Sequence, residues 1–469
     1  MTGEILKMYI PDVFETAAAG YVAAMSGYLK GREYLLFASP LSARSPDTSC
    51  LWHHAYRRRY YAAILIRYLA RFAVRLISLP WGLFKKRISW GYVITGKISD
   101  RILVVFAMCC RWDNGGKLIN SYVRTGEDDR CLVIGPRKSL AGEVSHINEL
   151  GVIEKWEILK ALCLAGTRAK LSDSALLFLE WVNWVLGLGW LELDAVWRTC
   201  DHVLGEKGIK KAGCVQEMHS SARIVWHAAR KHGLRTYTVQ HASISMAKTW
   251  YFTHEEERKA GVVLPDVMYI FNSRVKELLS LYYPGTLFKY GCSSRYAIWK
   301  DIRVPVRSDG YHLFVTGLAR FDNEVVLGAM FRLIEKGNTG KIRLRLHPFA
   351  KMSREHKRRV NGYDKKGTVE ISRGVALSDD IQGAGAVIGF SSTVLEEALM
   401  MNRPVVQLAH PYYLRYIDLE GLIGVAYKDH DKLSGEGLRA LSEELVDYSK
   451  VREILGINHK EVDYGVLFS

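Results

Sequence analysis

Side chains able to do chemistry stand where short apolar runs end in the second half of the chain. His347 and Pro348 follow the run IRLRL, and Ser391 and Ser392 follow the run AVIGF. Hydroxyls at a turn from a strand into a helix, together with free N–H groups at the helix amino end, form a phosphate site. An imidazole at the same phosphate can donate a hydrogen bond or a proton as a nucleotide leaves. The spacing therefore predicts a phosphate site, although a Ser-Ser pair ahead of a helix is also a common cap.

Three carboxylates could complete such a site. Glu397 lies one and a half turns into the helix expected after the two serines, where a carboxylate can accept the two hydroxyls of a ribose. Asp113 and Glu217 each follow an apolar run in the first half of the chain, and either can act as the base that deprotonates an acceptor hydroxyl. Both alternatives stay open. Asp379 and Asp380 fit a helix start rather than an Asp-x-Asp metal site, so no metal is expected.

Alternating strands and helices must position these residues. Such alternation predicts parallel, doubly wound sheets, in which ligands bind beyond the carboxyl ends of the strands. Strands are expected at 101–110, 130–135, 213–218, 234–240, 266–272, 311–317, 342–348, 368–372, 386–392 and 404–409, and helices at 220–233, 322–337 and 393–401. A stretch of linker composition at 290–310 divides the strands into two series.

The fold class expected from this pattern is α/β, with two Rossmann-like domains facing across a cleft. A chain of 469 residues is too long for one core and suits two domains. Residues 1–99 are expected to form a basic region with an amphipathic helix. Residues 100–300 then form the first Rossmann-like domain, with a Trp-rich helical insertion at about 150–210, and residues 301–469 form the second domain.

Positive charge is concentrated at the amino end. The chain carries a net charge of +16, and its first 90 residues hold thirteen Lys and Arg against five Asp and Glu. Arg67, Arg71 and Arg75 recur every four residues within an apolar stretch, so a helix there has one basic stripe, and Pro80 is expected to end it. A basic amphipathic helix is typical of an anchor at an anionic membrane surface. The alternative is a surface helix that packs its apolar side on the core.

The eight cysteines form no CxxC pair and indicate reduced thiols without disulfides or zinc. Charges at residues 4, 7, 12 and 15 argue against a secretory signal, and no uncharged run reaches the roughly 18 residues of a spanning helix. We expect a cytoplasmic protein that is soluble or peripheral on the inner face of the membrane.

The motifs RLHP and GFSSTVLEEALMMNRPVV resemble the C-terminal half of GT-B glycosyltransferases of bacterial surface carbohydrates. This group includes the sialyltransferases and the capsule and lipopolysaccharide Kdo transferases, which have His-Pro and Ser-Ser motifs that bind CMP. Glu397 lies seven residues before Pro404, as the ribose-binding Glu does in GT-B enzymes generally. The resemblance implies nucleotide binding by His347, Pro348, Ser391, Ser392, Thr393 and Glu397.

The segment VQEMHSSARIVWHAARKHGLRTYTVQHASI is similar to the part of this family that precedes the acceptor-facing loop. The resemblance implies that Glu217, Gln240 and His241 lie at strand ends facing the cleft. Ala242 stands where the family usually has Gly or Ser. The segment YGCSSRY is similar to the family's linker, which implies that Arg295 either contacts the donor phosphate or belongs to a hinge.

These resemblances imply an inverting, metal-independent glycosyltransferase that needs no cofactor. Its donor would be CMP-activated Kdo or a nonulosonic acid, and its acceptor a glycan or lipid-linked glycan of a surface polysaccharide or lipopolysaccharide. The alternatives are a CDP-glycerol-type phosphotransferase, a UDP-sugar GT-B enzyme such as an epimerase, and a non-enzymatic scaffold at a membrane or nucleic acid. No zinc-finger, RRM or helix-turn-helix signature accompanies the charge, so nucleic acid is not expected as a partner.

Overall fold

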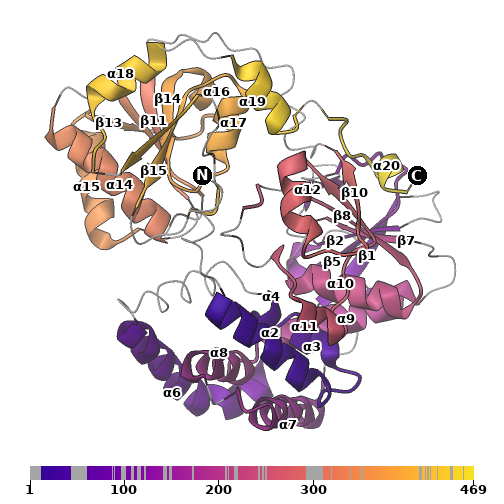
Figure 1. Cartoon of the computed structure of the whole chain (residues 1–469). Coiled ribbons are helices and arrows are strands. Elements are labelled where there is room, and N and C mark those ends of the chain that lie inside the picture. Colours follow the sequence, from indigo (N-terminus) through magenta and orange to yellow (C-terminus); the bar gives the residue numbers. More distant parts are fainter. Residues whose placement is uncertain are drawn as a thin grey trace.

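Two large β-sheets and a helical module make up the protein, seen here in a computed structural model (Figure 1). The structure describes residues 12–43, 61–86, 88, 90–96, 102–106, 110–112, 118–120, 123–140, 145–146, 150–171, 174–205, 209, 211–215, 220–240, 243–245, 248, 251–291, 310–317, 320–337, 340–348, 350, 352–410, 415–417, 419, 422, 424–429, 431–443, 447–457 and 459–468. The sections below concern these residues.

The helical module combines two stretches that are far apart in the sequence. It contains α2 (Asp12–Ser26), α3 (Glu33–Phe37), α4 (Pro40–Ala43), α6 (Tyr61–Lys85), α7 (Val152–Arg168), α8 (Ala175–Leu186) and α9 (Trp190–Leu204). The Tyr34 hydroxyl donates to Asp194 Oδ1 at 2.7 Å, and Asn183 Nδ2 donates to the Tyr68 carbonyl at 3.1 Å. The basic amino-terminal region and the Trp-rich insertion, which the sequence suggested as separate parts, therefore pack as one unit.

Helix α6 differs from its prediction in two ways. It continues through Pro80 to Lys85, because Pro80 lies on the exposed side, where water can satisfy the carbonyl that loses its N–H partner. Arg75 leaves the predicted basic stripe and turns inward, where its guanidinium donates to the carbonyl of Asn183 in α8. Burial and the neighbouring Arg71 lower the pKa of Arg75 below its usual value.

Within the described residues, no single helix is both long and apolar enough to cross a bilayer. Helices α8 and α9, bent by 64° at their junction, meet those criteria only as a pair.

The first sheet has eight strands in the order β10-β9-β8-β7-β2-β5-β1-β6. They are β1 (Trp90–Thr95), β2 (Ile102–Phe106), β5 (Cys131–Pro136), β6 (Ser145–His146), β7 (Lys211–Val215), β8 (Arg235–Val239), β9 (Val267–Ile270) and β10 (Leu287–Tyr290). All neighbours are parallel except β1, which pairs antiparallel with β5 and β6. Helices α10 (Ser220–Lys231), α11 (Glu255–Lys259) and α12 (Ser273–Ser280) connect these strands. A separate antiparallel pair of short strands, β3 (Cys110–Trp112) and β4 (Leu118–Asn120), follows β2 in the sequence.

The second sheet has six strands in the order β13-β12-β11-β14-β15-β16, and every pair is parallel. Its strands are β11 (Tyr311–Val315), β12 (Ile342–Arg345), β13 (Val369–Ile371), β14 (Ala384–Gly389), β15 (Val405–Ala409) and β16 (Val425–Asp429). Its helices are α14 (Arg320–Glu335), α15 (Arg354–Lys365), α16 (Leu377–Gln382), α17 (Val394–Met400), α18 (Gly435–Glu443) and α19 (Tyr448–Ile454).

Helices cover both faces of this second sheet. Leu313 and Val315 of β11 belong to one hydrophobic cluster, whereas Phe314 between them belongs to another. A parallel strand buried on both sides is the arrangement of a doubly wound sheet. The predicted α/β class, with two Rossmann-like domains and an additional helical region, is therefore confirmed.

The two domains meet where β9 ends. Phe271, the residue after β9, packs in the hydrophobic cluster of the second domain. Gly456 approaches it so closely that a Cβ atom there would lie 1.9 Å from the Phe271 carbonyl oxygen. The chain then returns to the first domain in α20 (Tyr464–Phe468), where the Tyr269 hydroxyl donates to the Val466 carbonyl at 2.8 Å. The predicted second domain of 301–469 thus contributes its last residues to the first.

We predict that Gly456→Ala destabilises the protein by about 3 kcal/mol or more, because the methyl group collides with backbone and φ is +74°. Gly374→Ala is the matched control, since Gly374 has a similar φ of +68° but nothing within 4 Å of its would-be Cβ. Left-handed strain alone should cost the control about 1 kcal/mol. Denaturant unfolding measures the free energy of unfolding of both variants. Equal decreases would show that the close approach of Gly456 to the Phe271 backbone contributes nothing to the cost.

Candidate functional site

The strand order of the second sheet singles out one edge. From β11 the chain proceeds to β12 and β13 on one side and then returns to β14 on the other. In doubly wound sheets the ligand crevice lies at this reversal, outside the carboxyl ends of the strands. His347 follows β12, and Ser391 follows β14, so both stand at that edge with β11 between them. The two strand spacings that separate β12 from β14 correspond to about 10 Å. This separation is within the span of one nucleotide.

Thr316, directly after β11, fixes the backbone of His347. Its buried Oγ1 accepts from the His347 N–H at 2.8 Å, and its own N–H donates to the Arg345 carbonyl at 3.1 Å. The His347 side chain is half-buried, and the neighbouring Pro348 is exposed. These hydrogen bonds thus join the ends of β11 and β12 at the residue that carries the imidazole.

Gly317, two residues after β11, is bonded to the start of α14. The Gly317 N–H donates to Asn323 Oδ1 at 3.1 Å, and a Cβ at Gly317 would lie 2.2 Å from Asp322 Oδ2. A side chain at this position would displace the Asp322 carboxylate. Asp322 and Asn323 are both buried at the start of α14. The sequence analysis missed this contact, although a Gly after a strand followed by Asp-Asn was the available signal.

Ser391 and Ser392 both accept backbone hydrogen bonds. Ser391 Oγ accepts from the Tyr416 N–H at 3.0 Å, and Ser392 Oγ accepts from the Val394 N–H at 3.4 Å. Each hydroxyl keeps its own hydrogen to donate. Thr393 is the N-cap of α17, which has only seven residues and makes no side-chain cap bond. Local structure therefore uses one side of each serine and leaves donors for a ligand oxygen.

Gln407 organises the loops around these serines. It is fully buried in β15, and its Nε2 donates to the carbonyls of Phe390 at 3.1 Å and Ile417 at 2.7 Å. Its Oε1 accepts from the Leu419 N–H at 3.1 Å. The sequence analysis overlooked this residue, whose signal was a lone amide in the apolar run PVVQLA.

Glu396 and Glu397 are both buried in α17. Glu396 accepts from the Ser243 hydroxyl of the first domain. The Ser245 hydroxyl of the same loop donates to the Tyr416 carbonyl at 2.9 Å. The loop after β8 therefore touches the second domain beside Ser391, which brings the two carboxyl edges together. Ribose binding by Glu397 stays a prediction.

Gln240 braces the carboxyl ends of β8 and β9. Its side chain is buried, its Oε1 accepts from the Phe271 N–H at 2.8 Å, and its N–H donates to the Tyr269 carbonyl at 2.9 Å. Its predicted contact with the ligand remains untested. Four other predicted site residues, Asp113, Glu217, His241 and Arg295, lie outside the described residues. The identity of the base and the linker contact are therefore still predictions.

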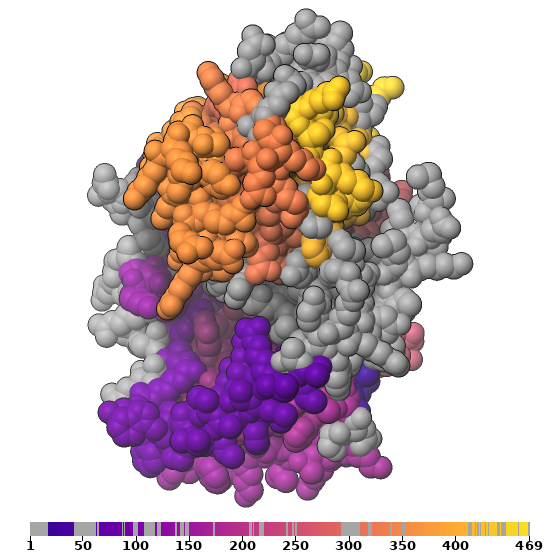
Figure 2. Space-filling view, turned by 90° about the vertical axis from the view of Figure 1, so that its left-hand side faces the viewer, coloured from indigo at the N-terminus to yellow at the C-terminus, as the bar shows by residue number. Residues whose placement is uncertain are grey.

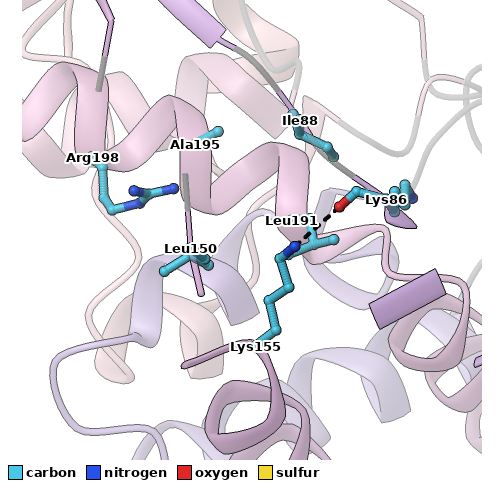
Figure 3. A pocket seen from close by; sticks show the side chains of 7 residues that line it. All are labelled: Lys86, Ile88, Leu150, Lys155, Leu191, Ala195 and Arg198. Atoms are coloured by element: carbon cyan, nitrogen blue, oxygen red, sulfur yellow. Dashed lines mark hydrogen bonds between the residues drawn. The ribbon is translucent and has the colours of Figure 1, made fainter. Parts of the chain in front are cut away.

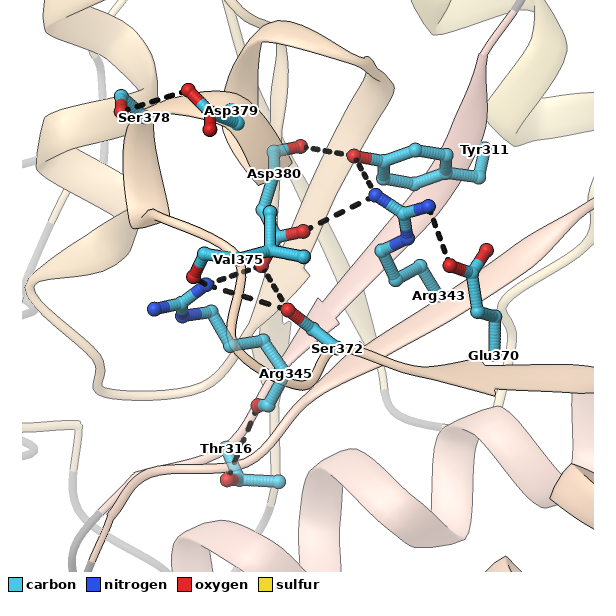
Figure 4. A network of polar contacts seen from close by, with 10 residues as sticks. All are labelled: Tyr311, Thr316, Arg343, Arg345, Glu370, Ser372, Val375, Ser378, Asp379 and Asp380. Carbon is cyan, nitrogen blue, oxygen red and sulfur yellow. Dashed lines mark hydrogen bonds and ion pairs between the residues drawn. The ribbon is translucent and has the colours of Figure 1, made fainter.

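A buried ion-pair network supports the other side of this edge (Figure 4). Asp380 of α16 is fully buried and accepts from Arg343, at 3.2 Å, and from Arg345 and Ser372. Arg345 also donates to the Val375 carbonyl at 3.1 Å, which ties the loop after β13 to β12. Asp380 is therefore a structural anchor here, where the sequence suggested a helix cap.

Tyr311 completes the network. Burial raises the pKa of Tyr311 above its usual value, against the opposing influence of Arg343, so the phenol stays protonated. It donates to the Asp380 carbonyl at 2.8 Å and accepts from Arg343 at 2.8 Å.

We predict that Asp380→Asn lowers the free energy of unfolding by about 3 kcal/mol or more, because two partly buried guanidinium groups lose their buried counter-charge. The matched control is Glu370→Gln, which removes the other, 64% exposed partner of Arg343 and should cost less than about 1 kcal/mol. Urea unfolding of both variants measures this. Similar values for the two would show that burial of the pair is energetically unimportant.

No protein-family model and no curated protein sequence matches this chain. Several solved structures are similar to it at low identity. UDP-N-acetylglucosamine 2-epimerase from Rickettsia bellii is 15% identical, with a TM-score of 0.39, over 56% of this chain and 75% of that one. MurG of Acinetobacter baumannii is 10% identical, with a TM-score of 0.34, over 58% and 75%. TarM is 11% identical, with a TM-score of 0.35, over 58% of each chain. At these values the fold assignment rests on the strand order above.

Proposed function

We propose that this chain is a GT-B glycosyltransferase that binds a nucleotide-activated sugar at the carboxyl edge of the second sheet. One observation supports the proposal: His347 follows β12 and Ser391 and Ser392 follow β14, the two strands that flank β11 at the reversal of strand order, and the Ser243 loop of the other domain contacts α17 there. The edge offers hydroxyl donors, an imidazole and a neighbouring buried carboxylate, which together suit a phosphate joined to a ribose.

In the proposed reaction, an acceptor hydroxyl oxygen attacks the anomeric carbon of the donor sugar, and the bond from that carbon to the phosphate oxygen breaks. The hydroxyl proton passes to a carboxylate, for which Glu217 and Asp113 are the candidates. The leaving nucleotide gains negative charge. His347 and the serine hydroxyls would meet that charge by hydrogen bonds without a metal.

The donor is proposed in finer detail from motif resemblance alone. The His-Pro and Ser-Ser pair favours a CMP-activated Kdo or nonulosonic acid, and a UDP-sugar or a CDP-glycerol-type donor is the alternative. The proposed acceptor is a glycan or lipid-linked glycan of a bacterial capsule or lipopolysaccharide. This acceptor would place the enzyme in the cytoplasm, at the inner membrane face.

Thermal-shift measurements with CMP, CDP and UDP test nucleotide binding. A nucleotide that binds the folded state raises the melting temperature by mass action. We expect Ser391→Ala and His347→Asn to weaken binding by about 10- to 100-fold, because each removes a hydrogen bond to a charged phosphate. Ser378→Ala, at the start of α16 and bonded only to its neighbour Asp379 in the described structure, serves as the control and should bind like the wild type.

Three outcomes would contradict the proposal in different ways. A protein that no nucleotide stabilises lacks the site altogether. Product mass spectrometry that finds a phosphodiester indicates the phosphotransferase instead. Turnover of UDP-N-acetylglucosamine without any acceptor indicates an epimerase.

A further inference from the structure

Helix α6 has two apolar faces, and only one of them is buried. Its inner face lies against α8 and carries the apolar residues of α6 that are buried or half-buried: Leu65, Tyr68, Phe72, Leu79 and Leu83. A second series, spaced by three or four residues, is exposed: Ile66, Ala70, Val74, Ile77, Trp81 and Phe84. This exposed series, which we call the outer stripe, covers the helix over its full length. Folding of the chain does not explain it, because the inner face alone secures the helix.

Exposed apolar side chains are concentrated on two helices. Of the sixteen large apolar residues that are exposed among the described ones, seven belong to α6 and four to α7. The most exposed are Ile77 at 82% and Ile153 at 79%. Monomeric soluble proteins rarely gather exposed apolar residues in this way, and such gatherings mark interaction surfaces.

Lys155 holds the two helices together at one end. It is buried at the start of α7, and its ammonium group donates to the carbonyls of Leu83 at 3.5 Å and Lys86 at 3.1 Å, which end α6. A cation at this position also stabilises the negative end of the helix dipole. The exposed Ile153 and Trp156 of α7 therefore lie near the last turns of the outer stripe.

Basic side chains border the outer stripe. Arg67 and Arg71 are exposed on the flank of α6 between the outer stripe and the buried face. Lys85 lies 3.8 Å from the centre of the Trp81 ring, so a cation and an aromatic ring sit together at the end of the helix. This combination of aromatic, aliphatic and basic residues suits the headgroup region of an anionic bilayer.

Three cations near the same end are already used inside the protein (Figure 3). Lys86, Lys155 and Arg198 line a small pocket there. Lys86 donates to the Gly187 and Leu188 carbonyls, Lys155 to α6, and Arg198 to Asp194. These hydrogen bonds join α6, α7 and the end of α8 at the pocket. Among the described residues that border the outer stripe, Arg67, Arg71 and Lys85 are exposed to a partner.

We propose that the outer stripe and the exposed start of α7 form a docking surface for a bilayer that contains anionic lipids. The side chains would enter the headgroup layer while α6 lies in the membrane plane, with Arg67, Arg71 and Lys85 at lipid phosphates. Figure 2 shows the indigo amino-terminal part of the chain at the lower end of the molecule and the orange and yellow second domain at the upper end. Docking there leaves the second domain free. The inference does not depend on sugar transfer, because vesicle binding needs neither donor nor acceptor.

Co-sedimentation of the full-length chain with vesicles tests the proposal. We expect binding to phosphatidylcholine vesicles that contain phosphatidylglycerol, weaker binding without it, and a further decrease as salt rises. Ile77→Asp should lower the partition coefficient by about tenfold or more. Replacing Arg67 and Arg71 by Gln should lower it by about fivefold for each cation. Leu281→Asp is the matched control, since Leu281 is 78% exposed on the first Rossmann-like domain, and should bind like the wild type.

Size-exclusion chromatography with light scattering measures the oligomeric state of the wild type and of Ile77→Asp. The proposal is overturned if the wild type binds neither type of vesicle, or if Ile77→Asp and Leu281→Asp behave alike. It is also overturned if the wild type is a dimer that Ile77→Asp converts to a monomer without any vesicle binding, because a second copy then covers the stripe. Circular dichroism of Ile77→Asp should match the wild type, since the side chain makes no buried contact to lose.

Discussion

Parallel pairing of β11 with both β12 and β14 is the constraint on which the candidate site depends. Parallel strands share one direction, so the residues after them emerge at one edge whatever their separation in sequence. His347 and Ser391, 44 residues apart, become neighbours across a single strand in this way. An antiparallel β14 would have put the serines at the opposite end of the sheet.

Buried polar side chains convert this shared edge into a defined surface. Thr316 joins β11 to β12, Gln407 holds the loops after β14 and β15, and Asp380 holds the loop after β13. Each is buried, and a buried polar group must have its hydrogen bonds satisfied. Other loop positions would leave donors or acceptors unsatisfied, which is why these residues specify loop geometry as well as stability.

Most strands of both sheets were predictable from the sequence because they are buried on both faces and appear as continuous apolar runs. The strands that were missed, β1, β6, β10 and β16, lie at or near sheet edges, where the runs are short or interrupted by polar residues. The helix of α6 was predicted, but its continuation past Pro80 was not, because that depends on which side of the helix faces water. The motif residues of the edge were found, whereas Gln407 and Gly317 were not, because their roles arise from contacts between segments distant in sequence.

The returning C-terminal tail has a mechanical consequence. The chain passes from the first domain to the second after Gly291 and passes back before α20, so two covalent connections join the domains. Two connections restrict rotation of the domains about either one alone. Opening of the domains must therefore be a rotation about an axis that passes near both connections. The Phe271–Gly456 contact lies beside the returning connection, so its atoms would move least, whereas the Ser243–Glu396 contact would separate.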